Sequence, residues 1–160
     1  MEPAEPSPVL NQELVDFVHS GVVVGVATRD ETMRPVLARA WGPQVSADRR
    51  SLTLCVAAAE GSAMRANLEG NGAVAIGFSP PTIAKAVQLK GVATVVREPV
   101  AEDLERAERH VAAFLAECGR IGAPAELAIR MFDRPALVLI EVPIDEGFDQ
   151  TPGPTAGRRL

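Results

Sequence analysis

The sequence has few of the residues that build disulfide scaffolds, metal sites or nucleic-acid interfaces. Its 160 residues include only two cysteines and two histidines, and its formal net charge is -5. Cys55 and Cys118 are too few for the disulfide framework of a small secreted domain. His19 and His110 have no second histidine, cysteine or carboxylate at ligand spacing, which argues against a metal site. The acidic balance and the absence of a basic cluster argue against nonspecific nucleic-acid binding.

Long apolar runs and targeting signals are also absent. No apolar run approaches the roughly 20 residues that a membrane-spanning helix needs, so we expect no membrane association. The first eight residues are acidic and rich in proline, unlike the basic start of a signal peptide. We therefore expect a cytoplasmic protein, in which residues 1–10 form a flexible leader. Gly21 and Gly25 lie before and inside a predicted strand, so they do not form a dinucleotide-binding fingerprint.

Apolar residues make up 47% of the chain, which is ordinary for one globular domain of this length. Their spacing predicts six strands, over residues 22–28, 35–41, 51–58, 73–78, 83–96 and 136–142. It also predicts helices over residues 11–20, 60–68, 101–119 and 125–132. Short turns and few helices favour an antiparallel sheet closed, or nearly closed, into a barrel. The predicted fold class is therefore mainly β (α+β), a six-stranded antiparallel barrel with a few flanking helices.

Two helices carry more detailed predictions. Asn11 is placed to cap the first helix. In the helix over residues 101–119, helical spacing predicts a buried apolar stripe. Its predicted members are Leu104, Ala107, Val111, Leu115 and Cys118. Trp41 lies alone on a strand, and a residue of this kind is more often part of a core or an interface than a stacking partner for a ligand.

The start of the predicted helix over residues 60–68 is a candidate anion site. A helix start exposes unpaired N–H groups and a positive dipole end, which favour a phosphate or a carboxylate. Ser62 and Arg65 lie three residues apart, so a hydroxyl and a guanidinium could bind the same oxygens. The alternative is that Ser62 only caps the helix and Arg65 is a solvated charge, since serine is a preferred cap residue.

The longest predicted strand, over residues 83–96, has a glycine in its middle. Gln88 and Lys90 share one of its faces, and Val87, Leu89 and Gly91 share the other. A glycine inside a strand indicates a bulge or a close approach of another backbone.

Three segments resemble, in order, the pyridoxamine 5'-phosphate oxidase-like family of FMN-binding split β-barrels. The first, residues 21–37, is similar to the family's opening hairpin with a proline near the start of the second strand. The second, residues 60–71, is similar to its serine- and arginine-containing helix, followed by an asparagine turn. The third, residues 82–93, is similar to its long strand with a central glycine. The resemblance covers about residues 14–143.

The resemblance implies an FMN-binding split-barrel domain over residues 11–147 and a role as an oxidoreductase acting on a small molecule. It implies a homodimer with FMN bound in clefts between the subunits. Ser62 falls on the family's phosphate-binding serine, and Arg65 lies near the basic residues that follow it. Lys85 falls on a basic position before the long strand, and Gln88 lies two residues beyond the family's glutamine. Arg39 lies close to the second-strand arginine, displaced by one residue.

Two alternatives remain open on the sequence. One is a dimeric split barrel without tight flavin binding, which would bind a small ligand or a partner. The other is the use of a deazaflavin in place of FMN. Residues 148–160 form a turn-rich tail, and we consider two roles for it: an ordinary surface segment, or a cover over the cleft of a partner subunit.

Overall fold

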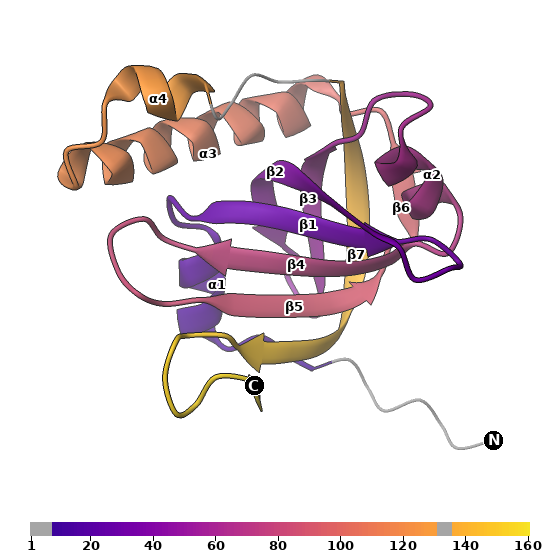
Figure 1. Cartoon of the computed structure of the whole chain (residues 1–160), viewed down its shortest axis with the longest axis horizontal. Helices are drawn as coiled ribbons and strands as arrows, with labels where there is room; N and C mark the ends of the chain where they lie inside the picture. The colour runs from indigo at the N-terminus through magenta and orange to yellow at the C-terminus, as the bar shows by residue number, and fades with distance from the viewer. Residues whose placement is uncertain (1–7, 131–135) are drawn as a thin grey trace.

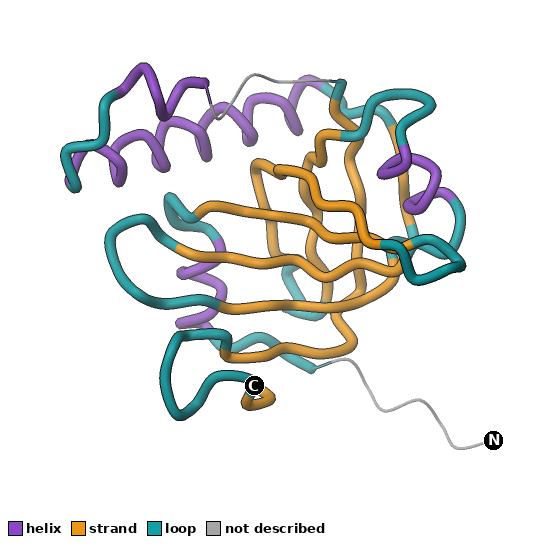
Figure 2. The backbone as a smooth tube through the Cα atoms, in the orientation of Figure 1, coloured by secondary structure: helices purple, strands orange, loops and turns teal. Residues whose placement is uncertain are grey.

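The computed structural model describes residues 8–130 and 136–160. Figures 1 and 2 show an antiparallel barrel with one long helix lying across its outside. The helices are α1 (Gln12–Val18), α2 (Ala63–Glu69), α3 (Ala101–Arg120) and α4 (Ala125–Arg130). The strands are β1 (Val23–Arg29), β2 (Pro35–Val45), β3 (Ser51–Ala57), β4 (Ala73–Ser79), β5 (Val87–Val92), β6 (Val95–Arg97), β7 (Leu137–Asp149) and β8 (Arg158–Arg159).

Six of these strands form a closed antiparallel ring, in the order β3-β2-β1-β4-β5-β7, because β7 also pairs with β3. The first half of β7 pairs with β3, and its second half pairs with β5. β6 and β8 pair with β7 and add to this ring. The prediction of a mainly β, six-stranded antiparallel barrel with flanking helices is confirmed for the described part of the chain.

The strand predicted over residues 83–96 is confirmed only in part. Residues 81–84 form bends and Lys85 and Ala86 are irregular, so β5 begins at Val87, and the ladder is interrupted at Ala93 and Thr94 before β6. The register between β5 and β7 shifts between Lys90 and Gly91. A Cβ atom at Gly91 would lie 2.1 Å from the carbonyl oxygen of Pro143. The central glycine therefore permits a close backbone approach beside an irregular step in the ladder, as its position in the strand predicted.

The barrel interior is filled by the buried faces of the strands and by two short helices. Val24, Leu54 and Ile76 belong to this core, with α1 adding Val18 and α2 adding Met64. The side chain of Asn11 accepts a hydrogen bond from the backbone N–H of Leu14, so the predicted cap of α1 is confirmed. The core therefore combines strands in which every second side chain faces inward with the apolar faces of α1 and α2.

The long helix α3 packs against β2, but the predicted stripe is wrong in part. Its buried residues are Asp103, Ala107, His110, Phe114 and Cys118, whereas Leu104 is 38% exposed. Polar contacts of Asp103 help to set which face of α3 is buried, and the pattern of apolar residues does not reveal such contacts. The carboxylate of Asp103 accepts hydrogen bonds from Arg97 (2.8 Å) and Arg106 (3.0 Å).

Beneath α3, Trp41 is 2% exposed and packs in a cluster with Cys55, Ala107, Leu137 and Leu139. Its prediction as a core residue is confirmed. The neighbouring Gly42 has a φ of +61°, and a Cβ atom there would lie 2.8 Å from the backbone nitrogen of Ala107. Glycine at this irregular step of β2 therefore lets the helix backbone come close to the strand.

The last predicted strand is longer than residues 136–142, because β7 continues to Asp149 and includes the start of the predicted tail. Residues 150–157 then turn, and β8 pairs back with Phe148 and Asp149. The end of the helix predicted over residues 125–132 and most of the predicted leader lie outside the described residues. Across residues 8–130 and 136–160, no helix combines the length and apolar character needed to cross a membrane.

Candidate functional site

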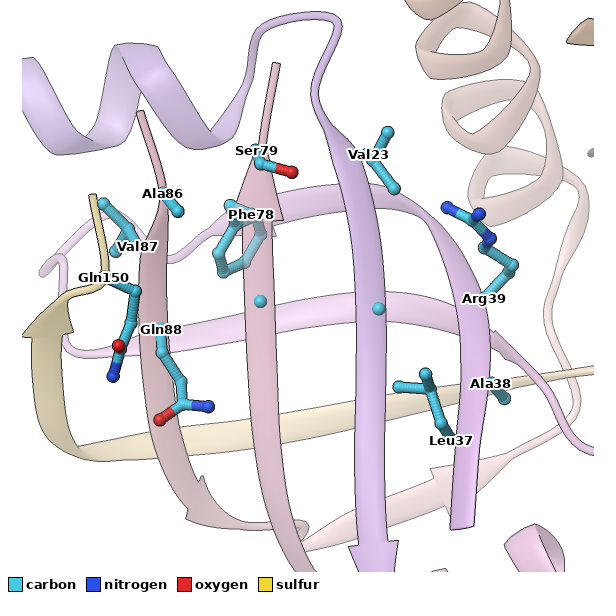
Figure 3. A pocket seen from close by; sticks show the side chains of 12 residues that line it. Val23, Leu37, Ala38, Arg39, Phe78, Ser79, Ala86, Val87, Gln88 and Gln150 are labelled. Atoms are coloured by element: carbon cyan, nitrogen blue, oxygen red, sulfur yellow. The ribbon is translucent and has the colours of Figure 1, made fainter. Parts of the chain in front are cut away.

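A groove of about 640 Å³ lies on the outer face of the barrel, over β1, β2, β4 and β5 (Figure 3). We call it the outer groove. Its lining includes Gly25, Leu37, Arg39, Gly77, Ser79, Gln88 and Gln150. This volume is within the range of about 300–1,000 Å³ that is typical of small-molecule sites.

Four lining residues form a single row across four strands. Arg39 of β2 is opposite Gly25 of β1, Gly25 is opposite Gly77 of β4, and Gly77 is opposite Gln88 of β5. Neighbouring strands lie about 4.8 Å apart, so three strand spacings separate Arg39 from Gln88 by about 14 Å. The row therefore places a guanidinium and an amide on opposite sides of two glycines.

The two central glycines leave the backbone uncovered at the floor of the outer groove. A Cβ atom at Gly77 would have no heavy atom within 4 Å, and one at Gly25 would meet only the Cδ1 atom of Leu37 at 3.6 Å. Side chains would fit here without disturbing the fold, so packing alone does not require glycine. A flat group can lie directly on this part of the sheet because no side chain projects from it.

The polar groups around the floor are available to a ligand. Arg39 is exposed, and within the described residues its guanidinium has no ion pair. In the same part of the chain, the side chains of Ser79, Gln88 and Gln150 make no hydrogen bond to protein. The outer groove thus offers one cation, two amides and one hydroxyl around an uncharged floor.

The predicted anion site at α2 is occupied by contacts within the chain. Ser62 is the N-cap of α2, and its Oγ accepts a hydrogen bond from the backbone N–H of Arg65 at 3.2 Å. The Arg65 guanidinium forms ion pairs with Glu69 and, at 3.0 Å, with Glu98. The hydrogen bonds that the guanidinium donates to these two carboxylates raise the pKa of Arg65. With Glu60, they line a second hollow that carries more negative than positive charge.

Lys85 lies in the loop before β5 and points to α1. Its Nζ atom is 3.2 Å from Glu13 and lies 4.8 Å from the centre of the Phe17 ring. The predicted cofactor residues therefore fall in three places. The fold brings Arg39 and Gln88 into one row, places Ser62 at the N-cap of α2 with Arg65 in the second hollow beside it, and places Lys85 beside α1. Their binding of a cofactor stays a prediction.

The sequence did not lead us to predict Gly25, Gly77 or Gln150 as site residues, although they form the floor and one wall of the outer groove. Gly25 and Gly77 each interrupt an apolar strand, and a glycine in that position is a known sign of close ligand or backbone approach. That signal was present in the sequence, but nothing there indicated that the two glycines are opposite each other. For Gln150, which lies beyond β7, the sequence held no comparable signal.

Behind the Arg39 side of the groove, a buried histidine holds α3 to the barrel. His110 is 7% exposed and shares a small cavity with Arg39. Its Nδ1 atom accepts a hydrogen bond from Gly42 N–H at 3.2 Å, and its Nε2 atom lies 2.9 Å from the Val22 carbonyl oxygen. Nδ1 must then be unprotonated, with the proton on Nε2. Burial lowers the pKa of His110, which favours this neutral form.

Metal chemistry has no support among the residues described. No group of three or more histidine, cysteine or carboxylate side chains in residues 8–130 and 136–160 could hold a metal ion. Cys55 is fully buried, and its burial raises the pKa of the thiol to about 11. The thiolate needed for nucleophilic attack is therefore scarce at neutral pH.

No protein-family model matches the chain, and no curated protein matches its sequence. Solved structures do match. HupZ from Group A Streptococcus is 19% identical with a TM-score of 0.55, and the match covers 93% of this chain and 100% of HupZ. A putative pyridoxamine 5'-phosphate oxidase from Lactobacillus delbrueckii is 18% identical with a TM-score of 0.54, covering 88% and 93%. An F420 reductase is 14% identical with a TM-score of 0.52, covering 86% and 98%.

These likenesses concern the fold, because every identity is below a fifth. They cover most of this chain and nearly all of each matched structure. The chain has the split-barrel fold of the pyridoxamine 5'-phosphate oxidase-like proteins, as its sequence predicted.

Proposed function

We propose that the outer groove binds a flavin nucleotide, with FMN as the first candidate, and that the protein is a flavin-dependent oxidoreductase acting on a small molecule in the cytoplasm. The observation that carries the proposal is the row of Arg39, Gly25, Gly77 and Gln88 across four strands. It combines an uncovered floor for a flat ring with a cation and an amide whose strands lie about 14 Å apart along the sheet, at the usual strand spacing. A flavin nucleotide has a flat ring and an anionic end.

The four residues of the row have three roles in this proposal. Gly25 and Gly77 let the ring lie against the backbone, and Gln88 forms hydrogen bonds with a ring edge. Arg39 binds the anionic end, since a guanidinium forms strong charge-assisted bonds with phosphate. When bound, the flavin supplies the hydride chemistry, while the chain provides binding, orientation and exclusion of water. A general acid or base is not required from the protein.

A homodimer fits this arrangement. The outer groove is open on one side, and Leu37 in its lining is an apolar side chain that is 75% exposed. A second copy packed on this face would bury Leu37 and cover the free face of the ring. We therefore propose that the site is completed between two subunits, as the family resemblance implies.

A deazaflavin is the alternative cofactor. It keeps the flat ring and the anionic chain to which the row is suited, and one structural neighbour is named an F420 reductase. Binding of a small ligand or a partner without tight flavin affinity is the second candidate function. Its support is that Arg65 and Lys85 already pair with carboxylates, which leaves Arg39 as the free cation among the predicted residues of the described chain.

Titration of the purified protein with FMN tests the proposal. We expect saturable quenching of flavin fluorescence. We expect Arg39→Ala to weaken binding by about 1.5–3 kcal/mol, the scale of a lost hydrogen bond to a charged group. This corresponds to roughly 10- to 150-fold in the dissociation constant. Arg34→Ala, in the exposed turn before β2, is the matched control and should bind FMN as the wild type does.

A colourless protein without saturable binding of FMN would exclude the flavin proposal and favour the second candidate. A deazaflavin titration under the same conditions separates the two cofactors. Size measurement of the protein with and without flavin tests the dimer, and a monomer that binds flavin tightly would remove the shared site.

A further inference from the structure

We infer that Gln150 binds the ring together with Gln88, and that this pair of amides selects a ring edge bearing a hydrogen-bond donor between two acceptors. The imide edge of a flavin has this pattern. The inference rests on the proposed flavin binding and extends it, because it gives the C-terminal tail a role in specificity. The tail acts here within its own subunit.

The backbone ladder places the two glutamines on one face. Gln88 is opposite Phe148, and Val87 is opposite Asp149. The next position continues the ladder, since the backbone N–H of Gln150 donates to the Ala86 carbonyl at 2.8 Å. Gln150 is therefore the diagonal neighbour of Gln88, a relation that spans about 7–8 Å and is within reach of long side chains.

The tail holds the backbone of Gln150 in place. The carboxylate of Asp149 accepts hydrogen bonds from Thr151 N–H and from the Thr155 hydroxyl, both at 2.9 Å. The Oγ1 atom of Thr151 accepts a hydrogen bond from Ala86 N–H at 3.2 Å. These contacts on both sides of Gln150 keep its Cα atom beside β5. Only the side chain remains to be ordered by a ligand, so less conformational entropy is lost on binding.

The free amides match the chemistry of an imide. Each glutamine side chain presents an N–H₂ donor and a carbonyl acceptor. Figure 3 shows both side chains extending in the same direction along the wall of the outer groove. Together they can donate to two ring carbonyls and accept from the N–H between them. Ala86, opposite Gln150, is small and leaves room for this edge.

The guanidinium at the other side of the row fixes the direction of the ligand. Arg39 lies on β2 and the glutamines lie at β5 and beyond, with the two glycines between them. An anion bound at Arg39 therefore places the opposite edge of a flat ligand near Gln88 and Gln150. This direction follows from the order of the strands.

The test compares FMN with FMN methylated at the imide nitrogen, which lacks the central donor. We expect the wild type to bind FMN at least about 10-fold more tightly than the methylated compound, from the loss of hydrogen bonds to neutral groups. Gln150→Ala should reduce this preference to about 2-fold or less, and Gln88→Ala should do the same. Gln12→Ala, on the exposed side of α1, is the control and should keep the wild-type preference.

Three results are distinguishable. A preference lost in Gln150→Ala, with an unchanged thermal unfolding temperature, supports the inference. Equal preference in Gln150→Ala and the wild type overturns it while leaving flavin binding intact. Absence of saturable FMN binding to the wild type overturns both the inference and the proposed function.

Discussion

Replacing Gly77 with valine would fill the floor of the outer groove without crowding the barrel. A Cβ atom at this position has no heavy atom within 4 Å. Glycine inside a strand costs about 0.5–1 kcal/mol relative to alanine, and valine is favoured in strands. We therefore expect Gly77→Val to raise the free energy of unfolding by about 0.5–1 kcal/mol.

Flavin binding should change in the opposite direction. The two methyl groups of the valine would project from the surface on which we place the ring, so the ring would have to move away from the backbone. Overpacking of a close-fitting site costs about 1–3 kcal/mol. The dissociation constant for FMN should therefore rise by roughly 5- to 150-fold.

Two measurements on the same protein check this prediction: urea unfolding and titration of FMN fluorescence. Gly119→Ala is the matched control, because a Cβ atom at Gly119 also meets nothing within 4 Å and this residue lies in α3, outside the groove. It should gain stability by up to about 1 kcal/mol and keep the wild-type affinity. A stable Gly77→Val that binds FMN like the wild type would refute the glycine floor as the binding surface of the ring.

Three further changes test other parts of the structure. Because two carboxylates already neutralise Arg65, Arg65→Ala should weaken FMN binding less than Arg39→Ala does in the same titration; an equal or larger loss would place the phosphate at α2. Asp103→Ala removes the carboxylate that pairs with Arg97 and Arg106, and it should lower the free energy of unfolding in urea by about 2–4 kcal/mol. As a control, Asp145→Ala at an exposed carboxylate should change it by less than about 0.5 kcal/mol. Similar losses in the two variants would contradict a stabilising role for the ion pairs of Asp103. Burial lowers the pKa of His110 in the folded state, so the unfolded chain binds a proton more readily below about pH 6.5. The free energy of unfolding should therefore decrease as the pH is lowered below this value, by up to about 1.4 kcal/mol per pH unit. His110→Gln should flatten that dependence between pH 6.5 and 5, and equal slopes for the two proteins would exclude His110 as its source.

The sequence alone determined most of the secondary structure, because its signals act between neighbours in the chain. Alternating apolar residues define β4, and the oxygen atoms of Asn11 and Ser62 cap α1 and α2 through N–H groups only three residues away. Short connections between strands then favoured an antiparallel barrel, and the closed ring confirms it. The glycine at position 91 was also interpretable locally, since a missing side chain in a strand indicates a close neighbour.

The grouping of side chains into one site depends on the tertiary fold. Arg65 pairs with Glu98, and the buried face of α3 depends on contacts with Arg97 and with β2. The register of β2, β1, β4 and β5 aligns Arg39 with Gln88 across two glycines, and the pairing of β5 with β7 brings Gln150 beside Gln88. Contacts between residues far apart in the chain depend on how whole strands pair, and residue type and local spacing carry little information about that pairing.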